Sequence, residues 1–222
     1  MPDPMEGFFE VIHRLHRDKE ASMDALVSGT IELTVDEWQF YVSMVDESYL
    51  GNAPTANGLV RSVGGAAMVE TGIYSGEVAV KYEAYDADPG PVSTDDTSQW
   101  TEIAEVPLEV TRDDVRVMSP YTCGDWRQGK NLAVSGPGLY QLRVCACGRD
   151  SDRDAVGLRS RNERYLVQLW PTTAATTRLV AAADSVGAGS RSGHQPSDEI
   201  PGLGWRISSV PERVLPTDVS PF

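Results

Sequence analysis

The chain has 222 residues, a formal net charge of −14 at pH 7 and a sequence pI of about 4.5. This length suits one domain with extensions and allows a sizeable core. The acidity disfavours direct nucleic-acid binding, because phosphates would be repelled, and it favours a basic partner surface or simply serves solubility. No apolar run approaches ~18 residues, so the sequence predicts no membrane-spanning helix.

The cellular compartment is predicted from the N-terminus and the cysteines. Residues 1–6 lack the charged region and following apolar run of a secretory signal peptide. The three cysteines are an odd number and do not make a disulfide framework. Both features indicate a cytoplasmic protein, and three lysines against sixteen arginines hint at a GC-rich bacterial genome.

The first segment, residues 1–28, is predicted to be a helix packed on the body. Asp3 can cap it and Pro4 suits the first helical position. An apolar stripe then recurs at helical spacing: Phe8, Ile12 and Leu15. His13 and His16 lie three residues apart on this helix, but with no third ligand nearby they are predicted to be exposed rather than metal-binding.

Residues 29–172 contain short β runs separated by Gly, Pro and Asp turns, which predicts an all-β fold, an antiparallel β-sandwich of seven or eight strands. The expected strands cover residues 31–35, 38–44, 76–85, 100–110, 115–118, 132–134, 140–147 and 165–170. Pro107 cannot donate to a ladder, so an edge strand or a break is expected there. The Gly- and Ala-rich residues 50–71 fit a loop or a short helix around 59–68.

The stretch Gly136–Cys147 is expected to organise the sandwich. Gly136-Pro137-Gly138 forms a turn, after which Tyr140, Leu142, Val144 and Ala146 share one face of a half-buried strand. The polar face carries Gln141, Arg143, Cys145 and Cys147. A tyrosine two residues after a turn glycine is typical of the tyrosine corner, in which the ring is buried and the hydroxyl bonds to backbone across the corner.

The C-terminal segment, residues 173–222, is predicted to be a largely irregular and poorly packed extension. Residues 172–183 fit a helix or a loop, and from Asp184 onward the composition shifts to Gly, Ser and Pro. Four apolar residues indicate that part of this extension lies across the body: Ile200, Trp205, Ile207 and Val210.

Two acidic loops contain the residue types that bind hard cations. Asp150, Asp152 and Asp154 have the odd-position spacing of a calcium loop, but Ala155 stands where Gly is needed and Arg161 where a bidentate Glu is needed. The loop at 86–99 could also hold a cation through its aspartates. A solvated polar loop is the prediction in both cases, so no metal or cofactor is expected.

The cysteines offer a further metal hypothesis. Cys145 and Cys147 lie on one face of a strand and could bind zinc with Cys123 and a histidine such as His194. Structural zinc pairs more often occur as C-x2-C on a turn, and a disulfide between residues i and i+2 of a strand is poorly shaped. Free thiols are therefore predicted.

No residue cluster specifies a reaction. The three histidines all lie in the flanking helix and tail, and the chain has no G-x-S-x-G, P-loop or dinucleotide motif. With 33 acidic residues, a carboxylate pair for glycoside hydrolysis cannot be recognised from the sequence. A non-enzymatic protein is predicted, with an enzyme of unrecognised type as the remaining hypothesis.

Four features of residues 29–171 occur in a fixed order. They are Ile-Glu-Leu-Thr-Val-Asp-Glu-Trp-Gln-Phe-Tyr-Val at 31–42, a middle strand, Val-Pro-Leu-Glu-Val at 106–110 and Gly-Leu-Tyr-Gln-Leu at 138–142. In this order they resemble the competence protein J family, named for an inhibitor of a DNA-entry nuclease. The N-terminal helix, the loops at 86–99 and 148–164 and the tail are additional. The resemblance implies a small non-catalytic β-sandwich that binds and inhibits a nuclease or toxin.

The sequence therefore predicts a protein-binding β-sandwich, an inhibitor or immunity-type partner of a basic protein such as a nuclease or toxin. It would contact neither nucleic acid directly nor a membrane. The acidic loop and the tryptophan after it are the predicted partner-binding residues: Asp86, Asp88, Asp95, Asp96 and Trp100. The alternative is a small-molecule or carbohydrate-binding module that uses Trp38, Trp100 or Trp126 on an open face.

Overall fold

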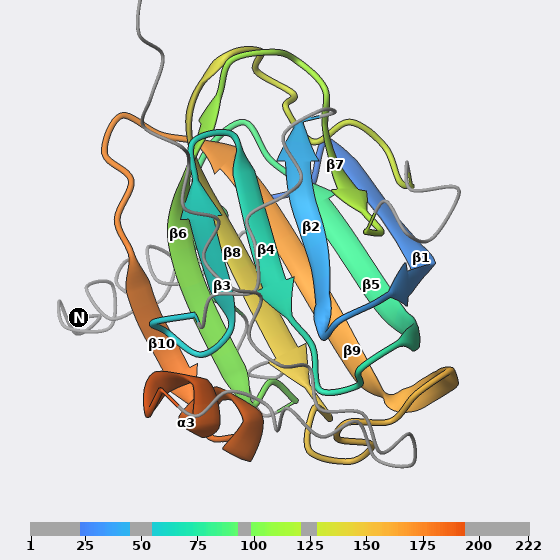
Figure 1. Cartoon of the computed structure of the whole chain (residues 1–222). Coiled ribbons are helices and arrows are strands. Elements are labelled where there is room, and N and C mark those ends of the chain that lie inside the picture. Colours follow the sequence, from blue (N-terminus) through green and yellow to red (C-terminus); the bar gives the residue numbers. More distant parts are fainter. Residues whose placement is uncertain (1–22, 45–54, 93–98, 121–127, 194–222) are drawn as a thin grey trace, which may run out of the picture.

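The computed structural model describes residues 23–44, 55–92, 99–120 and 128–193, and these ranges contain ten strands and one helix (Figure 1). The elements are β1 (Val27–Val35), β2 (Gln39–Met44), β3 (Val60–Val63), β4 (Ala66–Glu70), β5 (Gly76–Ala84), β6 (Glu102–Val110), β7 (Val115–Met118), β8 (Gly138–Cys147), β9 (Leu158–Pro171), β10 (Arg178–Ala182) and α3 (Ser185–Arg191). The predicted N-terminal helix, with His13 and His16, lies outside the described residues. No helix in the described part is long and apolar enough to cross a membrane.

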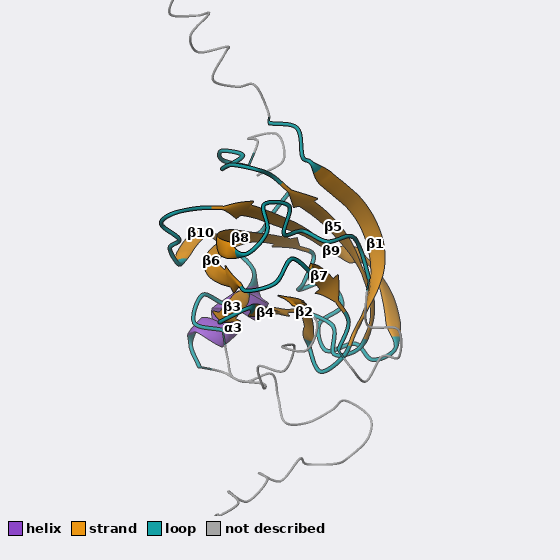
Figure 2. Ribbon diagram, turned by 90° about the horizontal axis from the view of Figure 1, so that it is seen from above, coloured by secondary structure: helices purple, strands orange, loops and turns teal. Residues whose placement is uncertain are grey.

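The strands form two sheets, which Figure 2 shows as two layers. The six-stranded sheet has the order β1-β5-β9-β8-β6-β10, and the four-stranded sheet has the order β3-β4-β2-β7. Neighbouring strands are antiparallel except β5 and β9, which run parallel. The prediction of an all-β fold is confirmed, and the β5–β9 pair departs from the fully antiparallel arrangement that was expected.

One apolar core contains residues of both sheets. The six-stranded sheet contributes side chains that include Leu33, Val78, Val80, Leu142 and Val144, and the four-stranded sheet contributes Phe40, Val42, Val69, Val115 and Val117. These residues alternate along their strands, as the period of a pleated strand requires. The faces predicted for the strands at 76–85 and 140–147 are therefore correct.

Tyr140 forms the predicted tyrosine corner. Its ring is fully buried, and its hydroxyl donates to the carbonyl of Gly136 at 2.7 Å and accepts from the amide of Ser135 at 3.2 Å. Leu139, one residue earlier, points the other way and is 37% exposed. Because a one-residue slip would exchange the two faces, this difference confirms the register of β8.

The second face of β8 is also buried, so the expectation of a half-buried strand is wrong. Gln141 exchanges hydrogen bonds with the backbone of Thr176, and Arg143 donates to the carbonyl of Gly90. Chain segments after β5 and after β9 therefore cover this face, and Cys145 packs there against Ile103. The alternation of the sequence showed the polarity of the face but not the segments that cover it.

Two local expectations are corrected by the hydrogen-bond pattern, and the edge strand expected at Pro107 is confirmed. The helix considered around 59–68 is instead the β3–β4 hairpin, in which Val60 pairs with Val69. Residues 132–134 form no strand, because the Asn131 carboxamide accepts from the amides of Val115 and Ala133 in place of a ladder. β10 pairs with β6 only at Glu102–Glu105, and Pro107 lies two residues further along. At Pro107, β6 therefore pairs with β8 alone and is an edge strand.

The prediction of an irregular extension from residue 173 is wrong for the part that the structure describes. β10 pairs with β6 and completes the six-stranded sheet, and α3 follows it directly. An isolated helix of this length is unstable in water, so tertiary contacts must hold α3 in place. Residues 194–222, with the four apolar residues of the tail, lie outside the described residues, and the division of the chain at residues 28 and 172 stays a prediction.

Candidate functional site

The predicted acidic loop begins directly after β5. Asp86 and Asp88 are exposed, and the Asp88 carboxylate accepts from the amide of Gly90 at 2.9 Å. Arg143 of β8 fixes the loop, because its guanidinium donates to the Gly90 carbonyl at 2.9 Å. Asp95 and Asp96 lie outside the described residues, so the structure places two of the four predicted aspartates.

Trp100, the fifth predicted residue, is half-buried on the outer side of the six-stranded sheet. Its ring packs against the cluster of Ile103, Cys145 and Leu166, and the guanidinium carbon of Arg164 lies 5.8 Å from the ring centroid. Part of the Trp100 ring is therefore buried against the sheet, and only the remaining part is exposed to a partner. Whether these five residues bind a partner remains a prediction.

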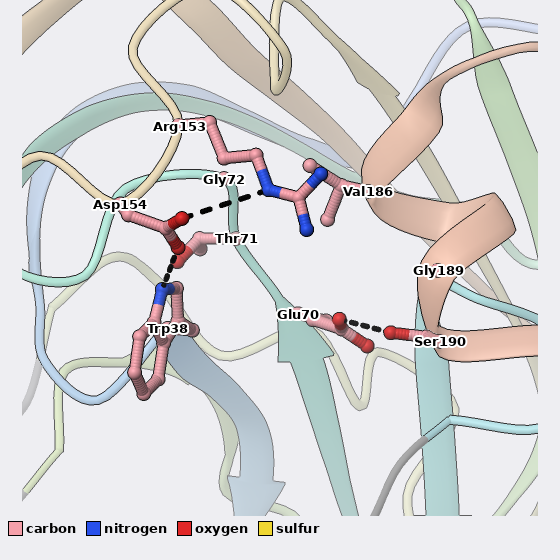
Figure 3. A pocket seen from close by; sticks show the side chains of 9 residues that line it. All are labelled: Trp38, Glu70, Thr71, Gly72, Arg153, Asp154, Val186, Gly189 and Ser190. Atoms are coloured by element: carbon pink, nitrogen blue, oxygen red, sulfur yellow. Dashed lines mark hydrogen bonds and ion pairs between the residues drawn. The ribbon is translucent and has the colours of Figure 1, made fainter. Parts of the chain in front are cut away.

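A second candidate site is a small cleft at the end of the molecule where β1 turns into β2 (Figure 3). Trp38, Asp154 and Arg153 bound one side of it, and Glu70 and Ser190 bound the other. Three loops and α3 meet here: the β1–β2 turn, the β4–β5 loop and the β8–β9 loop. Of these residues, the sequence singled out Trp38 as a ligand-binding tryptophan and Asp154 as part of a cation loop.

The β1–β2 turn carries Trp38 in a costly backbone conformation. Glu37 and Trp38 have φ values of 52° and 58° between the bridged residues Asp36 and Gln39. Turns of this kind favour Asn and Gly, and a left-handed conformation costs other residues roughly 1–2 kcal/mol each. Asp154, with φ of 61°, is the third non-glycine residue with positive φ in the described ranges. Such strain clusters at functional sites.

Four contacts hold the Trp38 side chain and backbone in place. The indole Nε1 donates to Oδ1 of Asp154 at 2.9 Å, and the Trp38 amide donates to the carbonyl of Tyr74 at 3.0 Å. The Trp38 carbonyl accepts from the amide of Thr71 at 2.8 Å. The rings of Trp38 and Tyr74 meet edge to face, with centroids 4.5 Å apart and planes at 83°. The aromatic pair is therefore held by contacts with the β4–β5 and β8–β9 loops.

A buried ion pair between Arg149 and Asp184 joins the β8–β9 loop to the start of α3. Arg149 is fully buried, and its Nε and Nη2 donate to the two carboxylate oxygens of Asp184 at 2.8 and 2.7 Å. Its Nη1 donates to the carbonyls of Gly58 at 3.0 Å and Glu70 at 3.3 Å. Asp184 also caps α3 by accepting from the amide of Gly187 at 2.8 Å.

A second ion pair, between the half-buried Arg191 and the buried Glu102, joins the end of α3 to β6. Arg191 donates to both oxygens of Glu102, at 2.9 and 3.2 Å, and to the carbonyl of Asn57 at 3.1 Å. Burial raises the pKa of Glu102, and the hydrogen bonds from Arg191 oppose that rise. A Cβ on Gly187 would lie within 2.9 Å of both guanidinium groups and of Glu102, so only glycine lets the α3 backbone approach these charges.

Two further buried acids fix the walls of the cleft. Glu70 accepts from the hydroxyl of Thr55 at 2.7 Å and from the hydroxyl of Ser190. Glu163 accepts from the amide of Gly72 at 2.7 Å and from the hydroxyl of Tyr165, and burial raises its pKa. Sequence reasoning missed these acids, although a glutamate at the end of an otherwise apolar strand, as at position 70, indicates a buried polar partner.

The loop with Asp150, Asp152 and Asp154, which has only the spacing of a calcium loop, uses its three carboxylates in three different structural contacts. Asp150 accepts from the amides of Ser185 and Val186 at the start of α3, and Asp152 accepts from the hydroxyl of Ser160 at 2.9 Å. Asp154 accepts from Trp38, as described above. The three carboxylates therefore face different partners, and no group of three His, Cys, Asp or Glu residues within the described ranges is placed to hold a metal ion.

The cysteines described by the structure are Cys145 and Cys147, which are buried and are not in a disulfide. Burial raises the pKa of the Cys147 thiol, and the nearby Arg164 lowers it to a smaller extent. Both thiols are thus packed parts of β8. The zinc hypothesis also involves Cys123 and His194, which lie outside the described residues.

Comparison with known proteins gives one partial structural similarity. No family model and no curated protein matches the chain. The structure is similar to that of ComJ from Bacillus subtilis, described as an inhibitor of the DNA degrading activity of NucA. The TM-score is 0.47 and the identity 16%, over 68% of this chain and 100% of ComJ. The resemblance expected from the sequence is therefore found, and its low level assigns no function.

Proposed function

We propose that the chain is a non-catalytic β-sandwich that binds a basic protein, as an inhibitor or immunity-type partner of a nuclease or toxin. The observation that carries the proposal is the net charge of −14 together with carboxylates at the surface, among them Asp86 and Asp88. An acidic surface attracts a basic one over distance and raises the association rate. A nuclease binds polyanionic substrate through a basic surface, so an acidic protein on that surface would exclude the substrate.

The proposed contact surface is the acidic loop with Asp86, Asp88, Asp95 and Asp96, and Trp100 beside it. Arg143 supports it, because the hydrogen bond to Gly90 fixes the described part of the loop on the sheet. Loop acids held in this way lose little conformational freedom on binding, which increases affinity. Exposed charges at the rim of an interface act mainly on the association rate and its salt dependence.

The experiment measures inhibition and binding of the nuclease or toxin encoded next to this gene. We expect the full-length chain to inhibit that protein, and we expect the association rate to fall when salt is raised from 50 to 200 mM. The variant Asp86→Asn/Asp88→Asn should associate more slowly. The matched control, Glu109→Gln/Asp113→Asn, removes two exposed charges elsewhere and should associate as the wild type does. An adjacent gene without a basic product, or a basic product that does not bind, would overturn the proposal.

The second candidate function, a small-molecule or carbohydrate-binding module, is favoured by the cleft beside Trp38. Sites for such ligands combine aromatic side chains with a few polar groups, and Trp38 lines this cleft together with Glu70, Asp154 and Ser190. A change in tryptophan fluorescence on adding a sugar or metabolite would support this function. The same change without any response to a basic protein would favour it over the first.

A further inference from the structure

The two sheets end in four edge strands, β1 and β10 in the larger sheet and β3 and β7 in the smaller one (Figure 1). An edge strand presents unpaired backbone groups, and proteins usually shorten, bulge or charge it so that it does not pair with another chain. β3 and β7 have four residues each, and β10 has five residues with a register shift between Leu179 and Ala181. β1 has nine residues and keeps one unbroken register with β5. Among the described strands, β1 is therefore the edge most suited to pairing.

β1 carries little net charge, although the chain as a whole is strongly acidic. Its single charged side chain is Glu32, and Nη2 of Arg159 lies 3.2 Å from Oε1 of this residue. Nε of Arg159 lies 3.6 Å from Oε2 of Glu77 in β5. β1 contains neither proline nor lysine, two residues that commonly protect an edge. The ammonium of Lys130 lies 3.5 Å from the carbonyl oxygen of Ser28, an exposed contact at the limit of hydrogen bonding that can open at little cost. Two copies can therefore approach at β1 without strong repulsion.

The sequence of β1, Val-Ser-Gly-Thr-Ile-Glu-Leu-Thr-Val, has a polarity pattern that is the same in both directions. The polar residues alternate with apolar residues or glycine, and Ser28, Thr30 and Glu32 are exposed on the outer face. Antiparallel pairing of two copies about a two-fold axis at Ile31 places residue 27 opposite 35, 28 opposite 34, 29 opposite 33 and 30 opposite 32. Polar side chains then meet polar ones, and Glu32 faces Thr30 rather than another carboxylate. β1 is thus self-complementary, as a two-fold interface requires.

The core-facing side of β1 offers apolar surface to a second copy. Leu33 and Val35 are buried, whereas Val27 and Ile31 pack against the same core and are only partly buried. In the two-fold pair, Ile31 lies beside Ile31 of the second copy, and Val27 lies beside Val35 of the second copy. Pairing would therefore remove from water apolar surface that β1 leaves exposed in the single chain.

We propose that β1 pairs antiparallel with β1 of a second copy of this chain, about a two-fold axis at Ile31, so that the two larger sheets form one continuous sheet. The inference goes beyond the proposed function and does not depend on it, because pairing uses neither the acidic loop at 86–99 nor Trp100. A single strand pair is a small interface, so the dimer is expected to be weak and concentration-dependent, with a Kd of roughly 10–100 μM.

Sedimentation equilibrium of the full chain, from about 5 μM to about 1 mM, should show the average mass rising from that of a monomer towards that of a dimer. Thr30→Lys places an ammonium opposite Glu32 of the second copy at two symmetry-related positions and should tighten the dimer about tenfold. Thr30→Lys/Glu32→Lys replaces this attraction with repulsion and should weaken the dimer about tenfold relative to the wild type. Lys81, which lies opposite Thr30 in β5, is the same in both variants, so their difference reports the contact between copies.

The matched control, Glu109→Lys/Thr177→Lys, makes the same change in net charge at exposed positions outside β1 and should dimerise as the wild type does. Amide resonances locate the contact, and we expect those of residues 27–35 to shift most as the concentration rises. A monomer at every concentration, an equal Kd for the two Thr30 variants, or shifts centred on residues 178–182 would each overturn the inference. Shifts of residues 27–35 that occur only when the basic protein encoded next to this gene is added would assign the edge to that protein and overturn the dimer.

Discussion

Replacing Arg149 with methionine should destabilise the fold more than any surface charge change. Methionine keeps much of the aliphatic length but removes four hydrogen bonds, two to Asp184 and one each to the carbonyls of Gly58 and Glu70. The side chains of Arg149 and Asp184 are 0% and 3% exposed, so water does not replace the lost partner. Asp184 would then be a buried carboxylate that keeps its hydrogen bond from Gly187 but has lost its counter-ion.

The expected cost is about 3–5 kcal/mol, the usual effect of removing one member of a buried ion pair. This is a large share of the roughly 5–15 kcal/mol that stabilises a typical domain. Arg149→Met/Asp184→Leu removes both charges, so it should be less damaging than the sum of its two single variants, although the α3 cap is lost as well. Arg159→Met is the surface control: its side chain is 63% exposed beside Glu32 and Glu77, and it should cost less than about 1 kcal/mol.

Urea denaturation followed by far-UV circular dichroism measures these differences, provided that the slope of the transition stays the same among the variants. A cost for Arg149→Met within about 1 kcal/mol of that for Arg159→Met would refute the buried-pair account. Strict additivity of the two single variants in the double variant would also refute it, because it would mean that the two charges do not interact in the folded state.

Three further predictions concern β8, α3 and metal. Tyr140→Phe should lower the free energy of unfolding by about 1–3 kcal/mol and Tyr140→Ala by about 3–5 kcal/mol, while Leu139→Ala should lower it much less. If urea denaturation shows Leu139→Ala to be the most damaging of the three, the register of β8 is wrong. Burial opposes ionisation of Asp150, but the hydrogen bonds from Ser185 and Val186 lower the pKa of its carboxyl below 3.8. The ionised carboxylate therefore stabilises the fold fully above pH 3.8, and this stabilisation is lost as the pH falls through the lower pKa of the folded state. The difference in melting temperature between wild type and Asp150→Asn should accordingly be constant from pH 7 to 5 and shrink by pH 3. EDTA should leave the melting temperature unchanged. If the fold did bind an ion whose free concentration were 100 times its Kd, removing that ion would lower the free energy of unfolding by about 2.7 kcal/mol, a shift that is easily measured.

The strands could be predicted because their information is local. Alternation along 76–85 and 140–147 identified the core faces of β5 and β8, and the Gly-Pro-Gly turn before Tyr140 indicated the tyrosine corner with its hydroxyl bound across the turn. The β3–β4 hairpin was left open between loop and helix because its strands are only four and five residues long and rich in small residues. The covering of the outer face of β8 could not be predicted, because loops far away in the sequence provide it.

The same reasoning explains why α3 was taken for part of an irregular tail. Its sequence, Ser-Val-Gly-Ala-Gly-Ser-Arg, has the composition of a linker, and local propensity gives it no reason to be a helix. The structure shows another use for those small residues: Gly187 lets the backbone approach Arg149, Glu102 and Arg191 closely.

The buried charges determine where α3 lies, because each guanidinium must meet one particular carboxylate. Apolar packing of so short a helix would leave its position less defined, whereas Asp184 and Arg191 at its two ends each have a buried partner of opposite charge. Ser190 then reaches Glu70 at the cleft. We infer that the ion pairs serve the position of α3 more than the stability of the fold, since apolar side chains of similar size would stabilise it as well. Arg149→Met/Asp184→Leu should therefore be more stable than Arg149→Met alone yet change the amide resonances of Ser190 and Glu70; unchanged resonances in that variant would show that packing alone positions the helix.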